Sequence, residues 1–152
     1  LQRRAQIRAA VLRWAPEAIW VEAVHAPLEL VNAQGQSASV ESLAGQPVVA
    51  FCGIGQPAGF RRTLEQCGYH VAAFRELPDH YAYRPRQTAQ LAEWVSRWDA
   101  AAVVCTLKDL MKIPYAQLGG RPLLALRIGL QLLEGCSALE NLLSRLLSQP
   151  ER

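Results

Sequence analysis

The sequence predicts an α/β fold: a mostly parallel sheet with helices packed on it, preceded by a helix and a small antiparallel hairpin element. Two observations predict it. From residue 46 onward, short apolar runs lack polar alternation, as in strands that are buried on both faces. Segments with helical periodicity separate these runs, and strand, helix and strand in succession form the unit of a parallel sheet.

The size and the change of pattern along the chain indicate its organisation. The 152 residues are 51% hydrophobic and 19% charged, which is enough to bury the core of one globular domain. We expect residues 1–45 to form a connecting helix and antiparallel strands that link two domains, and residues 46–152 to form a small α/β domain. The first residue is Leu1 rather than Met, so we expect the chain to be a piece of a longer protein or a processed product.

The first part contains one helical segment and three extended runs. Residues Gln2 to Trp14 have helical periodicity, and Pro16 ends the helix. The extended runs are Ala18 to His25, Leu28 to Asn32, and Ala38 to Val40. Between the last two runs, Gly35 is free to adopt a positive φ, so we expect a hairpin turn there.

The second part alternates buried strands with helices. The predicted strands are Pro47 to Cys52, His70 to Phe74, Ala101 to Cys105, and Pro122 to Leu126. The predicted helices are Pro57 to Cys67, closed by Gly68; a helix that begins at Pro85; a short helix from Thr106 to Lys112; and a last helix from Ser137. In the last helix, Glu140 completes a capping box, and we expect its leucines to face inward. These are Leu139, Leu142, Leu143 and Leu146.

The composition also limits the classes of function. The formal net charge of +3 is too small to indicate a nucleic-acid partner. No run approaches the roughly 18 apolar residues of a membrane span, so the domain should be soluble. The four cysteines are scattered, without a C-x-x-C pair or a Cys/His cluster, so we expect no metal site in this piece.

Polar or small residues follow the predicted strands, where ligands bind in open parallel sheets. Gly53 and Gly55 lie between a strand and a helix, where the backbone approaches a ligand closely and the helix start attracts an anion. Arg61, in the first turns of that helix, adds positive charge. The spacing is not that of a phosphate-binding P-loop and lacks the third glycine of a dinucleotide-binding turn, so the spacing alone favours a simple tight turn.

Asp79 and His80 are adjacent in a polar connection after a strand, which is typical of an acid/base element. The alternative is an Asp that caps a turn and a solvated His. In a third segment, Thr106 and Asp109 have the spacing of a capping box, which explains both without a ligand. Lys108 lies between them, where a cation could meet a phosphate. In a fourth segment, Arg127 could face the same edge or only solvent.

Three of these segments, in this order, resemble the tetraacyldisaccharide 4'-kinase (lipid A 4'-kinase) family, and the resemblance covers Val48 to Ile113. Ala50 to Pro57 resembles A-F-x-G-I-G-N-P, Leu77 to Tyr81 resembles F-P-D-H-[HY], and Thr106 to Asp109 resembles T-E-K-D. Tyr83 and Lys112 match the residues that follow the second and third motifs. The departures from the family pattern are Gln56 for Asn, Leu77 for Phe, and Leu107 for Glu.

The resemblance implies the C-terminal α/β domain of a kinase that transfers the γ-phosphate of ATP to the 4'-hydroxyl of a tetraacyldisaccharide 1-phosphate in lipid A biosynthesis. ATP and Mg²⁺ are expected to bind mainly to an N-terminal P-loop domain, which this domain closes over. The other implied partner is the glycolipid. The implied location of the whole enzyme is the cytoplasmic face of the inner membrane, with peripheral attachment to it. Since residues 1–152 contain no P-loop sequence, we expect this piece alone to be inactive.

In the family, the His of P-D-H works with a carboxylate of the N-terminal domain on the accepting hydroxyl. The resemblance therefore implies a catalytic role for His80, with Asp79 beside it. The residues expected to form the rim for substrate or phosphate are Gly53, Gly55, Lys108, Asp109 and Arg61.

Two other readings of the sequence stay open. The first is a flavodoxin-like or receiver-like interaction module, although a receiver needs a cluster of acids after its first strand and Cys52 to Ile54 offers none. The second is a free-standing domain that binds a small anionic molecule through Gly53 and Gly55.

Overall fold

The computed structural model describes residues 2–148. Contacts group the chain into two compact units. One unit is Pro27–Gly129, which we call the α/β unit. The other consists of the residues before Pro27 and after Gly129, which we call the helical unit. The division at residue 45 into an interdomain link and a C-terminal domain stays a prediction.

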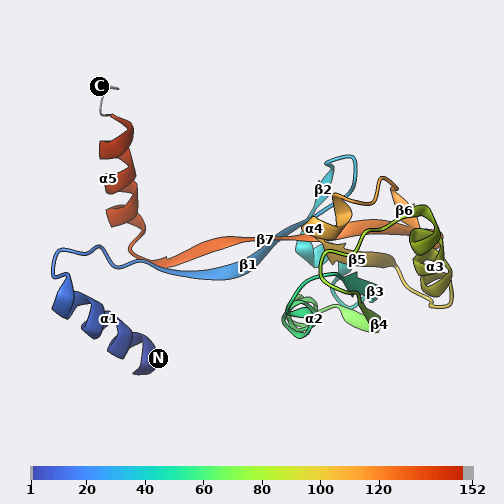
Figure 1. The fold of residues 1–152 in the computed structure, drawn as a ribbon, viewed down its shortest axis with the longest axis horizontal. Helices are drawn as coiled ribbons and strands as arrows, with labels where there is room; N and C mark the ends of the chain where they lie inside the picture. The colour runs from blue at the N-terminus through green and yellow to red at the C-terminus, as the bar shows by residue number, and fades with distance from the viewer. Residues whose placement is uncertain (1, 149–152) are drawn as a thin grey trace. The chain divides into compact units, whose positions relative to one another are not determined.

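A mostly parallel sheet forms the centre of the α/β unit, as the sequence predicts (Figure 1). Its parallel strands are β3 (Pro47–Cys52), β4 (His70–Glu76), β5 (Ala102–Thr106) and β7 (Arg121–Glu134). They lie in the order β7-β5-β3-β4. Beyond β7 come β1 (Glu22–Val31) and β2 (Ser37–Ala38), which pair antiparallel with each other. The short β6 (Gln117–Leu118) pairs antiparallel with β7.

Successive residues of β3 point to two separate hydrophobic cores. Val49 and Phe51 belong to a core that includes buried side chains of α3 (Pro85–Ser96). Val48, Ala50 and Cys52 belong to a core that includes Phe60 and Leu64 of α2 (Pro57–Gln66). Because both faces of β3 are covered, the strand is apolar throughout, and this explains the uninterrupted run in the sequence.

The connections after these strands follow the expected local chemistry. Pro57 and Pro85 each occupy the first turn of a helix, where the missing N–H removes no hydrogen bond. Gly68 has a φ of 80° at the end of α2. Thr106 caps α4 (Leu107–Leu110) by accepting a hydrogen bond from the Asp109 backbone N–H. The predicted capping interaction is therefore confirmed.

The region before β3 differs in part from the prediction. The two runs expected at Ala18–His25 and Leu28–Asn32 are replaced by one strand, β1, which passes through Pro27. The pairing with β2 reaches only Leu30 and Val31, so β2 needs no N–H from Pro27. The hairpin turn is confirmed, with Gly35 at a φ of 76°. The run expected at Ala38–Val40 is shorter, because a 3-10 helix, η1 (Val40–Leu43), begins there.

The last strand is much longer than expected. The sequence predicts Pro122 to Leu126, but β7 continues to Glu134. The segment after Leu126 is therefore no strand end, and Arg127 lies within β7, one residue past the Thr106–Leu126 pair. Its Nη2 lies 2.9 Å from Glu29 Oε1, and this ion pair links β7 to β1. The absence of a side chain at Gly129 leaves room for Leu28, since an added Cβ would lie 2.4 Å from Leu28 Cδ1.

The helical unit contains α1 (Gln2–Trp14), as predicted, and α5 (Cys136–Leu147). The expectation of a capping box at Ser137 is wrong, because Gly135, with a φ of 83°, precedes the helix and offers no side-chain cap. An added Cβ at Gly135 would lie 2.3 Å from the Trp20 carbonyl oxygen. The expectation of inward leucines is also wrong, since Leu142, Leu143 and Leu146 are exposed and Leu139 is half-buried.

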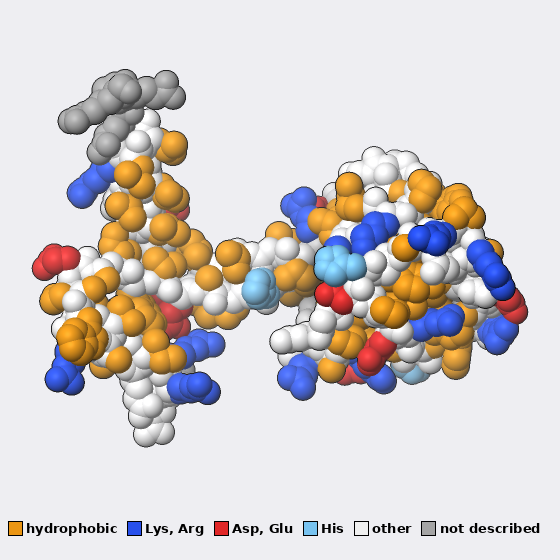
Figure 2. Space-filling view, viewed as in Figure 1, with side chains coloured by type: hydrophobic (Ala, Val, Ile, Leu, Met, Phe, Trp, Pro, Cys, Tyr) orange, Lys and Arg blue, Asp and Glu red, His pale blue; other side chains and the backbone are white. Residues whose placement is uncertain are grey.

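Apolar side chains are visible on the surfaces of both helices of the helical unit (Figure 2). Neither α1 nor α5 contains a buried residue within the described part of the chain. Arg8 on α1 lies 2.6 Å from Glu134 and stacks over the Trp20 ring at 5.7 Å. None of the helices in residues 2–148 has both the length and the apolar character that crossing a bilayer requires.

Candidate functional site

Three connections meet at the carboxyl edge of the parallel sheet. The turn after β3 begins at Gly53, a loop of residues 77–84 follows β4, and α4 follows β5. We call residues 77–84 the His80 loop. Because the carboxyl ends of parallel strands share one edge, these connections lie where ligands bind in such sheets. A hydrogen bond from the Leu77 N–H to the Cys52 carbonyl, at 2.9 Å, joins the first two connections.

Asp79 is the centre of a charged cluster. Lys108 Nζ donates a hydrogen bond to Asp79 Oδ1 at 2.7 Å, and His80 Nε2 lies 3.7 Å from Asp79 Oδ2. The hydrogen bond from Lys108 and then that from the His80 backbone N–H hold the pKa of Asp79 below its ordinary value, although desolvation opposes them. The structure thus brings together Asp79, His80 and Lys108, from two of the motifs that the sequence singles out.

The backbone of the His80 loop is unusual at two positions. His80 has a φ of 60° and Tyr83 a φ of 40°, a region that residues other than glycine rarely adopt. The His80 side chain is 81% exposed, so its imidazole is accessible to a molecule that approaches this edge. By contrast, the Tyr83 side chain is buried and its ring contacts those of Phe51 and Tyr81, with centroids 6.0 and 5.0 Å away.

Asp109 is a buried residue that connects the turn after β3 to the start of α4. Its carboxylate is fully buried, and Oδ2 accepts hydrogen bonds from the Gly53 N–H at 3.0 Å and from the Thr106 hydroxyl at 2.7 Å. Gly53 is closely surrounded, because an added Cβ would lie 3.1 Å from the Pro78 carbonyl oxygen and 3.2 Å from Asp109 Oδ1, and these groups would have to move slightly. The Gly53 N–H is therefore engaged by the protein in this structure.

The other two residues of the expected rim, Gly55 and Arg61, have different surroundings. Gly55 is exposed, and nothing lies within 4 Å of an added Cβ. Arg61 Nε donates a hydrogen bond to Glu65 at 3.0 Å, and its guanidinium stacks 5.9 Å from the Phe74 ring centroid. Cys52, immediately before Gly53, is not a candidate nucleophile, because burial raises the pKa of its thiol to about 12.

The contact between Lys108 and Asp79 gives a direct prediction. In Lys108→Met the carboxylate loses its main stabilising donor, so the pKa of Asp79 should rise toward its ordinary value. A carboxyl ¹³C titration by NMR measures this pKa. Lys112→Met is the matched control, because Lys112 Nζ bonds the Tyr81 carbonyl instead. An unchanged Asp79 titration in Lys108→Met would show that the ion pair does not persist in solution.

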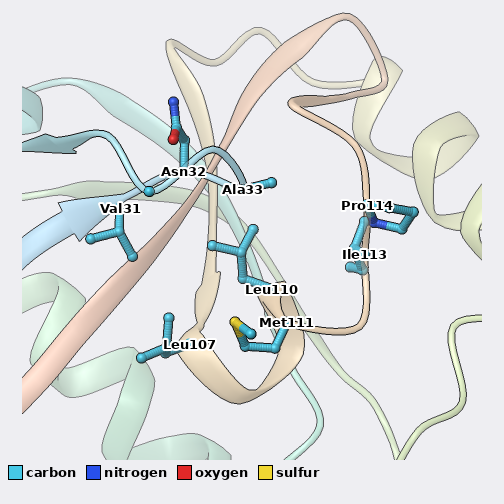
Figure 3. Close-up of a pocket in the computed structure, with 9 residues that line it drawn as sticks. Val31, Asn32, Ala33, Leu107, Leu110, Met111, Ile113 and Pro114 are labelled. Carbon is cyan, nitrogen blue, oxygen red and sulfur yellow. The ribbon is translucent and has the colours of Figure 1, made fainter.

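An apolar pocket of about 290 Å³ lies beside α4 (Figure 3). Leu107, Leu110 and Met111 line it from α4 and the residue after it, Val31 lines it from the end of β1, and Asn32 lines it from the hairpin turn. Leu107, which stands where the family pattern has Glu, is part-exposed at this pocket. The pocket and the charged cluster thus lie beside the same short helix.

Sequence reasoning missed the contribution of Tyr83 and the link between Gly53 and Asp109. Tyr83 is matched to the family only as the Tyr that follows P-D-H, and the aromatic residues in an otherwise polar loop were the available signal. Local capping explains Asp109 fully, so its bond to a residue 56 positions away has no local signal. In residues 2–148 no group of three or more His, Cys, Asp or Glu side chains is arranged to hold a metal ion.

Comparison with known proteins shows the family of this chain's relatives. A family model described as tetraacyldisaccharide-1-P 4'-kinase matches residues 2–148. A tetraacyldisaccharide 4'-kinase of Anaeromyxobacter dehalogenans is 35% identical over 123 residues, which are 79% of this chain and 32% of that protein. One of Methylobacterium nodulans is 38% identical over 104 residues, 67% of this chain and 31% of that protein. The chain therefore spans about a third of the length of these relatives.

A similar fold occurs in a solved structure. The crystal structure of LpxK from Aquifex aeolicus in complex with ATP aligns with a TM-score of 0.58. The alignment covers 88% of this chain and 40% of that one, at 23% sequence identity. This likeness supports the α/β fold described above.

Proposed function

The chain belongs to the tetraacyldisaccharide-1-P 4'-kinase family, and we propose that it forms one wall of the active site of such a kinase. The reaction is the transfer of the γ-phosphate of ATP to the 4'-hydroxyl of a tetraacyldisaccharide 1-phosphate. The observation that carries the proposal is the convergence of Asp79, His80 and Lys108 at one sheet edge, floored by Asp109.

In this proposal His80 is the catalytic residue of the wall. Phosphoryl transfer requires the attacking hydroxyl to be oriented and to lose its proton, and an exposed imidazole is suited to accept it. Asp79 lies beside the imidazole and stabilises its charged form once the proton has been transferred. The hydrogen bond from the His80 backbone N–H to Asp79 Oδ1, at 2.9 Å, holds the Asp79 carboxylate against the backbone of His80.

Lys108 supplies the positive charge of the wall. It is one of two lysines in the chain, and its ammonium is part-exposed beside Asp79. We propose that it approaches a phosphate of the bound substrates when the cleft is occupied. An ammonium with three donors can bond Asp79 and a phosphate oxygen at once. Gly53 and Asp109 shape the rim from below, whereas Gly55 and Arg61 lie at its outer part.

In this proposal ATP and Mg²⁺ lie next to this chain but are bound mainly by another part of the protein. ATP supplies the phosphoryl group, and Mg²⁺ neutralises the charge that builds on it. The clustered carboxylates that hold Mg²⁺ are lacking in residues 2–148, and the Gly53 N–H is bonded to Asp109. We therefore propose that another domain of the same protein holds ATP and Mg²⁺. We also propose that the complete enzyme works at the cytoplasmic face of the inner membrane, where it meets its glycolipid.

The experiment compares two proteins. The complete gene product and the 152-residue chain are each incubated with ATP, Mg²⁺ and tetraacyldisaccharide 1-phosphate, and ADP release and glycolipid phosphorylation are measured. We expect the complete protein to phosphorylate the 4'-position and the 152-residue chain to do neither. Absence of transfer by a folded complete protein would refute the function, and turnover by the 152-residue chain would refute its dependence on a second domain.

A further inference from the structure

Asp109 is a buried carboxylate without an ion-pair partner in residues 2–148. Burying a charge is costly unless hydrogen bonds compensate it. Asp109 Oδ2 receives two such bonds, from Gly53 and Thr106. A local helix cap needs only the bond with Thr106, and a solvent-exposed Asp would make it equally well. The burial of Asp109 therefore calls for a role beyond capping.

The second carboxylate oxygen faces the His80 loop. Asp109 Oδ1 is buried and has no hydrogen-bond partner in the described residues, and the same is true of the Tyr83 hydroxyl. A Cβ added at Gly53 would lie 3.2 Å from Asp109 Oδ1, 3.1 Å from the Pro78 carbonyl oxygen and 3.4 Å from Tyr81 Cβ. Oδ1 and these two atoms of the loop therefore surround the same point. The pKa of Tyr83 is raised by burial first and by the Asp109 charge second, which is consistent with their proximity. A buried donor and a buried acceptor thus lie near each other at the base of the loop.

Tyr83 anchors the far end of the same loop. Its side chain is 7% exposed, and its carbonyl oxygen accepts a hydrogen bond from the Thr88 hydroxyl at 3.1 Å. At the near end, Leu77 bonds the Cys52 carbonyl. Between these ends His80 is held at a positive φ that an L-residue adopts only when its surroundings impose it. The loop that presents the imidazole is therefore constrained from below.

We propose that Asp109 is a positioning residue: with the Tyr83 hydroxyl it fixes the loop that presents His80, and it does so without touching the substrate. This inference rests on the proposed kinase function for its kinetic consequence. Its structural consequence is independent of that function. Loss of the carboxylate frees Gly53 and the base of the loop together, so the imidazole no longer keeps its place relative to the accepting hydroxyl.

The test uses the complete protein with Asp109→Ala and the conservative variant Asp109→Asn. Misplacing a reacting group by about 1 Å can cost roughly 100-fold in rate, so we expect kcat to fall by about 10- to 100-fold in Asp109→Ala. Both KM values should stay nearly unchanged. Asp109→Asn should recover most of the activity, because the amide oxygen can still accept from Gly53. Amide exchange at Gly53 and in the His80 loop should accelerate in Asp109→Ala.

Val103→Ala is the matched control, because Val103 is fully buried in β5 and makes no contact with substrate in the proposal. It should weaken the fold while leaving kcat and loop exchange unchanged under conditions where the protein is folded. If Asp109→Ala behaves like Val103→Ala, or if Asp109→Asn loses as much kcat as Asp109→Ala, the positioning role is refuted. If Asp109→Ala does not fold, Asp109→Ser takes its place: loop exchange faster than in Asp109→Asn supports positioning, and equal exchange rates in the two variants refute it.

The contribution of Tyr83 is tested by a double-mutant cycle. Tyr83→Phe removes only the hydroxyl, so if it acts through Asp109, the loss in Asp109→Ala/Tyr83→Phe should be less than the product of the single losses. Losses that multiply would show that Tyr83 acts separately. If wild-type protein transfers no phosphate, the proposed function fails, whereas the exchange rates of Gly53 and the loop still decide the positioning claim.

Discussion

His80→Ala in the complete protein should lower kcat for glycolipid phosphorylation by about 10²- to 10⁴-fold, the usual contribution of a general base. The side chain is highly exposed at the sheet edge and lies beside Asp79, so its removal takes away the proton acceptor without disturbing the core. The KM for ATP should change little, because in the proposal ATP is held by another domain. Initial rates of phosphate transfer over a range of ATP concentrations measure both quantities.

His70→Ala is the matched control for this substitution. His70 is also exposed, but it lies at the start of β4, whereas His80 follows its carboxyl end. The two substitutions therefore remove the same type of side chain at the start of β4 and beyond its end. His70→Ala should leave kcat within about twofold, since exposed substitutions away from a site change little. Equal kcat values for the two variants would eliminate His80 as the base.

Phe51→Ala should be the most destabilising simple substitution in the α/β unit, at about 3–5 kcal/mol, because it leaves a large cavity in a packed core. Phe51 is fully buried, lies on the β3 face that packs toward α3, and contacts the Tyr83 ring. The free energy of unfolding of this unit is measured in the complete protein by hydrogen exchange of the β3 and β5 amides.

Phe74→Ala provides the comparison of like with like. Phe74 is only half-buried in β4, where it contacts Phe60 and lies under Arg61. We expect a clearly smaller loss, because part of that ring already contacts solvent. If both substitutions cost the same, the core around Phe51 would not be the main source of stability in this unit.

The elements that were predicted well are those with strong local signals. The β3 strand is a continuous apolar run, α2 has Pro57 at its start and Gly68 after its end, and α4 has its Thr106 cap. In each case the residues that determine the conformation are neighbours in sequence. The alternation of such elements was then sufficient to predict a parallel sheet with helices packed on it.

The misjudged elements depend on contacts that are distant in sequence. The extension of β7 beyond Leu126 depends on its neighbour β1. The ion pair between Arg127 and Glu29 joins residues near the two ends of the α/β unit in the sequence. Polar Arg127 and small Gly129 interrupt the apolar run, so the local pattern ends too early. In α5, leucine spacing predicts an apolar face but cannot say whether anything covers it within residues 2–148.

The site shows the same division. The general rule for strand ends placed His80, Asp79 and Lys108 on one edge, and the structure confirms that Lys108 and His80 both contact Asp79. Their catalytic and binding roles stay predictions. The Gly53–Asp109 bond could not be predicted from the sequence. The helix cap already explains an Asp at position 109, and the sequence pattern does not show that this Asp is buried.

The most direct test of the proposed active-site wall is photocrosslinking from the His80 loop to the glycolipid. A photoreactive amino acid is placed in the complete protein at Ala82, which is exposed in the loop, or at Asp99, which is exposed before β5 at the opposite edge of the sheet. Labelled tetraacyldisaccharide 1-phosphate is added, and crosslinked peptides are identified by mass spectrometry. We predict adducts from position 82, competed by unlabelled substrate, and none from position 99. Adducts from position 99 alone, or equal adducts from both positions, would contradict the proposal that this edge faces the substrate.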